Sequence, residues 1–155
     1  MKVKKVQFII CLVILLLFAS QAWAAEWVLY HTSAVGNESY DKSSMKKLDN
    51  NVISVLTKTI YNDVGKLKNY SALKKMDKAP GNPYILSHEL VLLEIDCLNR
   101  KIKVSSRRIC DKRGGIIASE MQSHGAWSDI VPNSNYEKLK NQFCGFVKKS
   151  KIKKK

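Results

Sequence analysis

The residues that could carry out chemistry in this chain are few and scattered. Its histidines lie far apart and lack a partner at metal-site spacing: His31, His88 and His124. The chain has no Gly-x-Ser-x-Gly motif, no phosphate-binding glycine loop and no paired histidine motif. The nearest approach to a catalytic pair is Asp129 with His124 or Ser128. Since Trp127 and Ile130 are predicted core residues, Asp129 is better explained as a turn residue. The sequence therefore predicts a non-enzymatic protein without metal or cofactor.

The N-terminal segment has the composition of a secretory signal peptide. Lysines precede an apolar run from Val6 to Ala19, and Ala22-Trp23-Ala24 supplies the small-x-small pattern of a cleavage site. We expect cleavage before Ala25, which makes residues 1–24 a signal peptide. A retained membrane anchor is the weaker alternative, because the apolar run is shorter than the ~20 residues that span a bilayer. Cys11 lies too far before the cleavage motif to be the lipidated residue of a lipoprotein.

Export would place the remaining cysteines in an oxidising compartment: Cys97, Cys110 and Cys144. An odd number of cysteines predicts one disulfide and one leftover thiol. Which two of them meet depends on the elements that position them.

Hydrophobic periodicity predicts a sheet of short strands over residues 26–32, 52–61, 87–97, 101–108 and 115–121. Gly36-Asn37 is a turn signal, and Tyr40 to Ser44 forms a short strand or turn. A short helix is expected over Ser71 to Met76, before Pro80 and Pro83 break the chain. Short turns between the later strands indicate an antiparallel meander.

A helix is predicted after the last strand. Ser134 and Glu137 have the spacing of a capping box. An apolar stripe follows at helical spacing: Tyr136, Leu139, Phe143, Cys144 and Val147. The fold class is therefore α+β: a small antiparallel β-sheet (meander) with a C-terminal helix packed on one face.

The cysteine pairing follows from these elements. Cys97 shares the dry face of its strand with Val91, Leu93 and Ile95, and Cys144 lies on the apolar stripe of the helix. We predict a Cys97–Cys144 disulfide. Cys110, beside a turn, is then the odd thiol, and a small semi-buried residue is favoured over a reactive one.

Basic residues dominate the charge: 27 Lys and Arg face 13 Asp and Glu, a formal net charge of +14. The lysine-rich block 148–155 is predicted to be a disordered tail after a single domain over residues 25–147. A second concentration lies in predicted structure, where the hairpin 87–108 should have a basic outer side. Alternation places Ile102, Val104, Ser106 and Arg108 on one face of its second strand and Lys101, Lys103, Ser105 and Arg107 on the other. This predicted basic patch comprises Arg100, Lys101, Lys103, Arg107, Arg108, Lys112 and Arg113.

Both basic clusters would attract polyanions such as glycosaminoglycans, anionic lipid head groups or nucleic acid through salt-sensitive forces. The alternative is that this charge only keeps the protein soluble and close to an anionic envelope. No helix-turn-helix, zinc-finger or aromatic-basic RNA-binding pattern accompanies the charge, so specific recognition of nucleic acid is not predicted.

In the order of its motifs, the chain resembles the surface-adhesin protein E family of exported bacterial proteins, most strongly from Glu94 to Cys144. The matching elements are Trp27 and Tyr30, Tyr40-Asp41, Ser43-Ser44, Asp96-Cys97, Arg100 and Lys101, the turn Cys110 to Gly114, the segment Trp127 to Ser134, and Cys144. Two departures stand out. Cys110 replaces the usual Tyr of the turn, and the signal peptide lacks the lipidation site of the best-known member.

The resemblance implies a small antiparallel sheet with a C-terminal helix packed on it, and binding of host matrix and serum proteins such as vitronectin and laminin. We therefore predict an exported binding protein of the periplasm or cell surface whose basic patch docks onto such proteins, acidic glycans or anionic lipid head groups. The alternative is a periplasmic accessory or structural envelope protein without a role in host adhesion.

Overall fold

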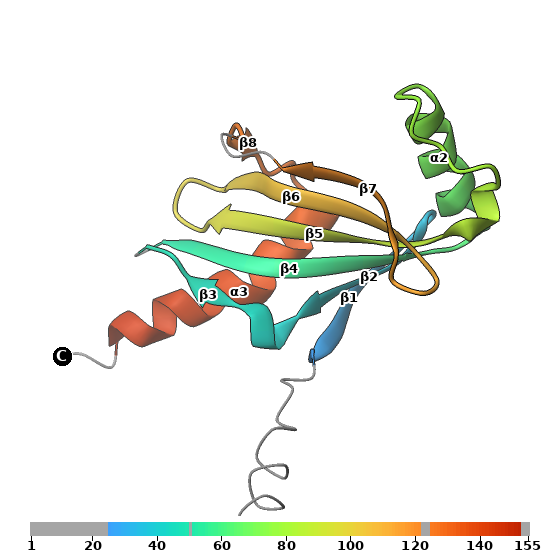
Figure 1. Cartoon of the computed structure of the whole chain (residues 1–155). Coiled ribbons are helices and arrows are strands. Elements are labelled where there is room, and N and C mark those ends of the chain that lie inside the picture. The colour runs from blue at the N-terminus through green and yellow to red at the C-terminus, as the bar shows by residue number, and fades with distance from the viewer. Residues whose placement is uncertain (1–24, 50, 122–124, 153–155) are drawn as a thin grey trace, which may run out of the picture.

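The computed structural model describes residues 25–49, 51–121 and 125–152, with side chains described up to residue 145. An antiparallel sheet and the helices that pack on it make up this part of the chain (Figure 1). The predicted signal peptide, His124 and the last three residues lie outside the described residues.

Strands β1, β2, β4, β5, β6 and β7 follow one another across the sheet in chain order, while β3 pairs with β4 and β8 with β6. The strands are β1 (Trp27–Ser33), β2 (Gly36–Asp41), β3 (Lys46–Lys47), β4 (Val52–Tyr61), β5 (Leu86–Asp96), β6 (Lys101–Asp111), β7 (Ile116–Met121) and β8 (Ser128–Asp129). The predicted meander and its α+β class are confirmed.

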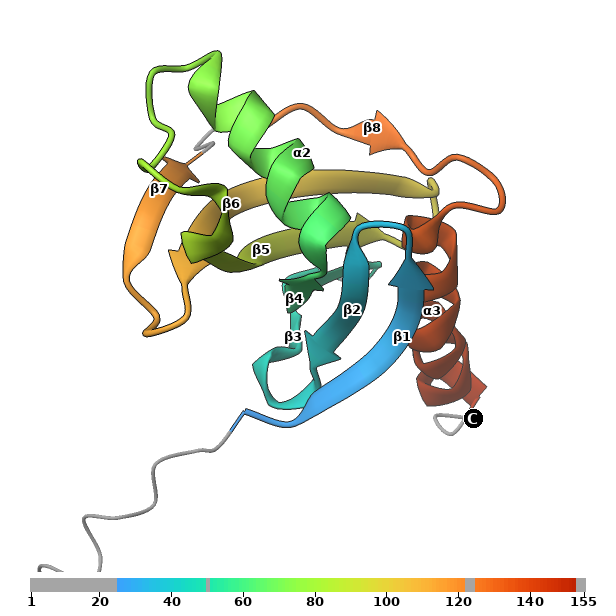
Figure 2. The ribbon, with the colours of Figure 1, turned by 90° about the vertical axis from the view of Figure 1, so that its right-hand side faces the viewer.

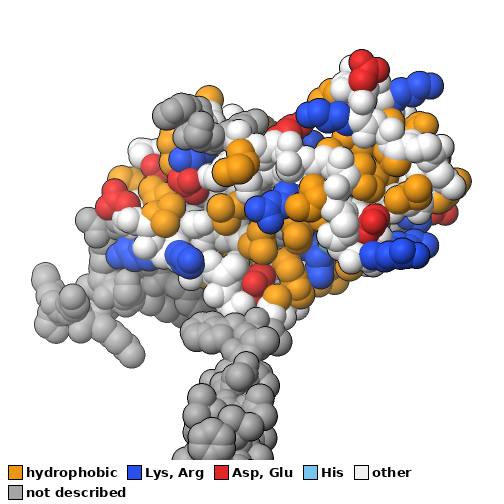
Figure 3. All heavy atoms as spheres, viewed as in Figure 1, with side chains coloured by type: hydrophobic (Ala, Val, Ile, Leu, Met, Phe, Trp, Pro, Cys, Tyr) orange, Lys and Arg blue, Asp and Glu red, His pale blue; other side chains and the backbone are white. Residues whose placement is uncertain are grey.

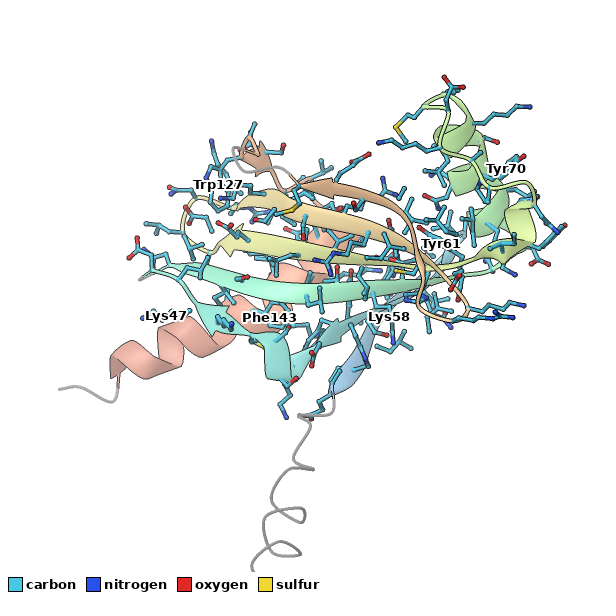
Figure 4. The ribbon with its side chains drawn as sticks, in the orientation of Figure 1. Lys47, Lys58, Tyr61, Tyr70, Trp127 and Phe143 are labelled. Carbon is cyan, nitrogen blue, oxygen red and sulfur yellow. A yellow bond between two sulfur atoms is a disulfide. The ribbon has the colours of Figure 1, made fainter. Side chains whose placement is uncertain are left out.

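The C-terminal helix α3 (Asn135–Ile152) lies behind the sheet in Figure 1. Its Leu139 and Phe143 are buried against β4 and β5, on what we call the inner face of the sheet. The ring of Phe143 meets that of Tyr40 edge to face, with 4.7 Å between centroids. Figure 4 shows Phe143 beneath the middle of the strands. This core holds the helix on the face where the sequence places it.

The capping of α3 resembles the predicted box. The Ser134 hydroxyl accepts from the Glu137 amide at 3.2 Å, but the Glu137 carboxylate accepts from the Asn133 amide, one residue before the expected donor. The helix continues to Ile152, so residues 148–152, predicted as part of a disordered tail, are helical. Lysine is a good helix former, which lets the helix extend past its apolar stripe.

A second helix, α2 (Asp63–Lys74), packs at the other end of the sheet (Figure 2). Leu73 is buried against Tyr61, Leu86 and Ile109 in a second core cluster. The Asn62 side chain caps the helix by accepting from the Gly65 amide at 2.9 Å. The sequence predicts only a short helix over residues 71–76, because the lysine-rich segment has little apolar periodicity before Leu73.

The turn predicted at Gly36-Asn37 lies two residues earlier, at Ala34-Val35, because Gly36 begins β2 and pairs with Ser33. A Cβ at Gly36 would lie 2.0 Å from the Ile60 carbonyl oxygen of the paired strand β4. Glycine is needed there because two backbones approach closely, and its φ of 150° suits no other residue. The Tyr40 to Ser44 segment forms the end of β2 and a 3₁₀ turn, η1 (Lys42–Ser44).

Alternation on β6 is interrupted by a bulge. Leu92 pairs with Ser106, but the next residue, Leu93, pairs with Val104. The extra residue, Ser105, reverses the alternation beyond it. Arg107 therefore points to the inner face and Arg108 to the opposite, outer face, so the predicted faces of Ser106, Arg107 and Arg108 are wrong.

The predicted Cys97–Cys144 disulfide is present, with 5.5 Å between the Cα atoms. It joins the end of β5 to α3 beside the core that Phe143 fills. Cys110 is buried and free, and burial followed by the Asp111 charge raises the pKa of its thiol. Since the thiolate is the reactive form, the burial and the raised pKa both disfavour reaction at Cys110.

Cys97→Ser and Cys144→Ser should each destabilise the protein by ~3–4 kcal/mol, because each removes the whole loop constraint. The double variant should lose little more, since both changes remove the same bond. Thermal unfolding of the three variants under oxidising conditions measures this. Losses that add in the double variant would contradict a pairing that acts as a single restraint.

Candidate binding surface

The predicted basic patch is distributed along the whole of β6 and its flanking turns. Arg100 precedes the strand, and Lys112 and Arg113 follow it. A strand of this length extends about 35 Å, at roughly 3.3 Å per residue. Arg107 and Arg108 are consecutive in the strand, so their side chains point to opposite faces of the sheet. The seven cations are therefore not a single patch.

Carboxylates neutralise three of these cations. Arg100 pairs with Glu137 at the start of α3. Lys103 lies 2.8 Å from Glu94 on the outer face, and Arg107 lies 2.7 Å from Glu89 on the inner face. The Asn133 amide and the Arg100 guanidinium lower the pKa of Glu137. These three cations connect parts of the fold, and their charge is already balanced.

Lys101 belongs to the same balanced end of the strand. It pairs in register with Asp96 on one side and Asp129 on the other. Burial would raise the pKa of Asp96, but hydrogen bonds from Asn99 and Leu98, and then the charge of Lys101, lower it. The β5–β6 turn therefore offers little unbalanced positive charge.

Trp127 differs from its predicted role as a core anchor. It is 38% exposed, whereas the neighbouring Ile130 is buried. The Lys103 ammonium lies 5.2 Å from the centroid of the Trp127 ring, a cation–π contact that covers the edge of the sheet. Asp129 lies in β8, consistent with a structural role.

Arg107 lies within a polar cluster on the inner face that sequence patterns do not predict. Its guanidinium donates to Glu89 at 2.7 Å and to Asn69 of α2 at 3.0 Å. Tyr61, only 5% exposed, has a hydroxyl without a hydrogen-bond partner among the described residues. In the sequence, this cluster is indicated only by Glu89, a charged residue at a position that strand alternation places on the inner face.

The cluster continues towards α3. Glu38, 6% exposed, accepts from the Tyr30 hydroxyl at 3.1 Å and from the Asn135 side chain at 2.6 Å. Burial and then Glu38 raise the pKa of Tyr30, while burial and then Glu89 raise that of Tyr136. These phenols stay protonated at neutral pH and cannot act as bases. The cluster therefore holds both helices to the sheet by hydrogen bonds.

The other three cations of the predicted patch, together with Lys58 of β4, lie on the outer face and at one end of the sheet. We call Lys58, Arg108, Lys112 and Arg113 the outer cationic surface. Lys58 and Arg108 flank Leu90 in one cross-strand row, and the Lys58 ammonium lies 4.0 Å from the centroid of the Trp27 ring. Arg108, Lys112 and Arg113 are exposed. None of these four has a carboxylate at ion-pair distance among the described residues.

Figure 3 shows the outer face, where Lys and Arg side chains stand as separate spots among hydrophobic ones. Exposed apolar residues of this face include Ile60, Ile116 and Met121. Figure 4 places Lys58 near the end of β4 that approaches α2. Burial and the nearby Lys58 lower the pKa of His88, which keeps that imidazole neutral near pH 7. Mixed charged and apolar surfaces of this kind suit macromolecular contacts.

The described residues contain no group of three His, Cys, Asp or Glu side chains that could hold a metal ion. Within the same part of the chain, no helix is both long and apolar enough to cross a membrane.

The model of the family described as surface-adhesin protein E matches residues 27–145, from β1 into α3. The chain belongs to this family. It is therefore a surface adhesin-like protein, a class defined by binding rather than catalysis. No curated protein and no solved structure gives a significant match to the chain.

The neighbouring arginines of this adhesin-like protein should differ in their effect on stability. Arg107→Gln should cost about 1–3 kcal/mol, because Glu89 and Asn69 lose their partner. The matched variant Arg108→Gln should stay within about 0.5 kcal/mol of wild type, since that side chain is exposed. Urea unfolding of both variants measures this. Equal losses would contradict the opposite facing of the two side chains.

Proposed function

We propose that the protein is an exported, non-enzymatic adhesin-like protein that docks onto acidic macromolecules through its outer cationic surface. Its partners would be matrix or serum glycoproteins such as vitronectin and laminin, or acidic glycans. The observation that carries this proposal is the division of charge along β6. Arg100, Lys103 and Arg107 are paired within the fold, whereas Arg108, Lys112 and Arg113 are exposed and without a carboxylate partner among the described residues.

Unpaired charge of this kind supports docking for an electrostatic reason. A cation already paired with a carboxylate must give up that pair to bind a partner, whereas an unpaired one gains a counter-charge without such a loss. Without Lys2, Lys4 and Lys5 of the predicted signal peptide, a formal net charge of +11 would add long-range attraction that weakens with salt, since the Debye length is about 8 Å at physiological ionic strength. Exposed Ile60 and Ile116 beside the cations supply apolar area that salt does not screen.

A second candidate function rests on the lysine-rich C-terminus. The helix carries residues 148–152 away from the outer cationic surface, towards the end of the chain marked in Figure 1. Lysines placed there would hold a periplasmic accessory or structural protein against anionic envelope lipids without using β6. The two functions place the binding charge on different parts of the molecule, so substitutions separate them.

The test is binding of the protein to immobilised vitronectin, laminin and heparin across a salt series. Arg108→Glu should weaken binding by roughly tenfold, equivalent to about 1.4 kcal/mol. Lys47→Glu is the matched control, because Lys47 is also exposed on a strand but lies at the far end of the sheet in Figure 4. It should retain most of the affinity.

A further variant replaces the lysines from 148 onward with glutamine and keeps the chain length. Retained binding at physiological salt supports the outer cationic surface. Binding that disappears with these lysines, or that falls equally for Arg108→Glu and Lys47→Glu, would contradict it. In that case anionic lipid vesicles should bind the wild-type protein but not the lysine-to-glutamine variant.

A further inference from the structure

The end of the sheet near α2 has a hollow of about 440 Å³. Its walls are two short segments that are distant in sequence: Asn82, Tyr84 and Ile85 on one side, and Asp111, Lys112 and Arg113 on the other. This volume falls within the roughly 300–1,000 Å³ typical of small-ligand sites. Both segments lie at the end of the sheet that faces the viewer in Figure 2.

The hollow follows from how β5 and β6 end. Their pairing stops at Leu86 opposite Asp111. On the β5 side, the chain before Leu86 is the 3₁₀ turn η2 (Pro83–Ile85). On the β6 side, the chain after Asp111 is the turn that leads to β7. These two turns extend beyond the last paired residues and leave a space between them.

Local hydrogen bonds fix both walls. The Asn82 side chain accepts from the Tyr84 amide at 2.9 Å and caps η2. In the opposite turn, the Asp111 carboxylate accepts from the Arg113 amide at 2.7 Å and the Gly115 amide at 2.8 Å. Asp111 is therefore committed to its own turn, and the backbone that carries both cations is held in place. A site with preformed walls loses less conformational entropy when a ligand binds.

The two walls offer different chemistry. Tyr84 is 52% exposed and Ile85 is 43% exposed, so one wall presents an aromatic ring and an aliphatic side chain to solvent. The Lys66 ammonium, 5.7 Å from the centroid of the Tyr84 ring, connects this ring to α2. The opposite wall presents Lys112 and Arg113, which have no ion-pair partner among the described residues.

We propose that this hollow binds an acidic saccharide. The apolar C–H face of a sugar ring would stack on Tyr84, and its carboxylate or sulfate would pair with Arg113 and Lys112. Arginine suits this role because its planar guanidinium matches a carboxylate or sulfate through two parallel hydrogen bonds. A bare inorganic anion would leave the aromatic wall unused, and a neutral sugar would leave the cations unused. The inference rests on the proposed function and names the ligand class and the subsite.

The test is calorimetric titration of the protein with a heparin-derived tetrasaccharide, which carries sulfates and carboxylates, and a hyaluronan tetrasaccharide, which carries carboxylates alone. Neutral N-acetylated chitotetraose is the control ligand. At least one acidic tetrasaccharide should bind saturably, and the one that binds identifies the acidic group. Chitotetraose should bind at least about tenfold more weakly, a difference of about 1.4 kcal/mol.

Four variants locate the subsite. Tyr84→Ala and Arg113→Gln should each lower tetrasaccharide affinity by roughly tenfold. Tyr84→Phe keeps the ring and should stay within about twofold of wild type, as should Lys47→Glu, whose charge lies outside the hollow, at the far end of the sheet in Figure 4. Thermal unfolding of Tyr84→Ala should match wild type, because the side chain is half exposed.

The inference is overturned if neither acidic tetrasaccharide binds saturably, if chitotetraose binds equally well, or if Tyr84→Ala keeps full affinity. Loss of tetrasaccharide binding in Lys47→Glu to the same extent as in Tyr84→Ala would also overturn it. In each of these cases the proposed function stands separately if binding to laminin or long heparin still depends on Arg108. The proposed function itself fails if the wild-type protein does not bind laminin or long heparin at physiological salt.

Discussion

The burial of α3 on the inner face of the sheet is the constraint on which the rest of the structure depends. Leu139 and Phe143 fill the core over β4 and β5, and the Cys97–Cys144 disulfide joins the helix covalently to the end of β5. With α2 on the same face at the other end, the inner face is occupied by the chain's own helices. The surfaces left for a partner are the outer face and the ends of the sheet.

The same constraint explains how charge is divided. Elements that cover the inner face must satisfy its polar groups. Arg107 donates to Glu89 and to Asn69 of α2, and Glu38 accepts from Asn135 of α3. These charged groups stabilise the fold, and their internal contacts leave them unavailable to bind a partner. Arg108, one residue from Arg107, faces the other way and is left to solvent. A single strand thus contributes to stability on one face and carries part of the proposed binding surface on the other.

Sequence patterns predicted features that depend on local periodicity and chemistry. The bounds of β4, the hairpin of β5 and β6 and the disulfide follow from alternating or helical spacing of apolar residues, and the start of α3 follows from its capping residues. The bulge at Ser105 could not be predicted, because it is fixed by pairing between strands and leaves no mark in the order of residues. Similarly, the sequence indicates a turn at Gly36, because the close approach of the β4 backbone that requires glycine there is known only from the structure. The hollow depends on such long-range pairing, so the sequence indicated its cations but not Tyr84.

The measurement that tests the central claim most directly is backbone amide NMR of the isotope-labelled protein during titration with heparin tetrasaccharide. If the closed inner face leaves the outer face and the α2 end of the sheet for recognition, shift changes should concentrate at Tyr84, Lys112 and Arg113. Amides of α3 around Leu139 should stay unchanged. Shift changes confined to the lysine-rich end of α3, or spread over the inner face, would contradict the account.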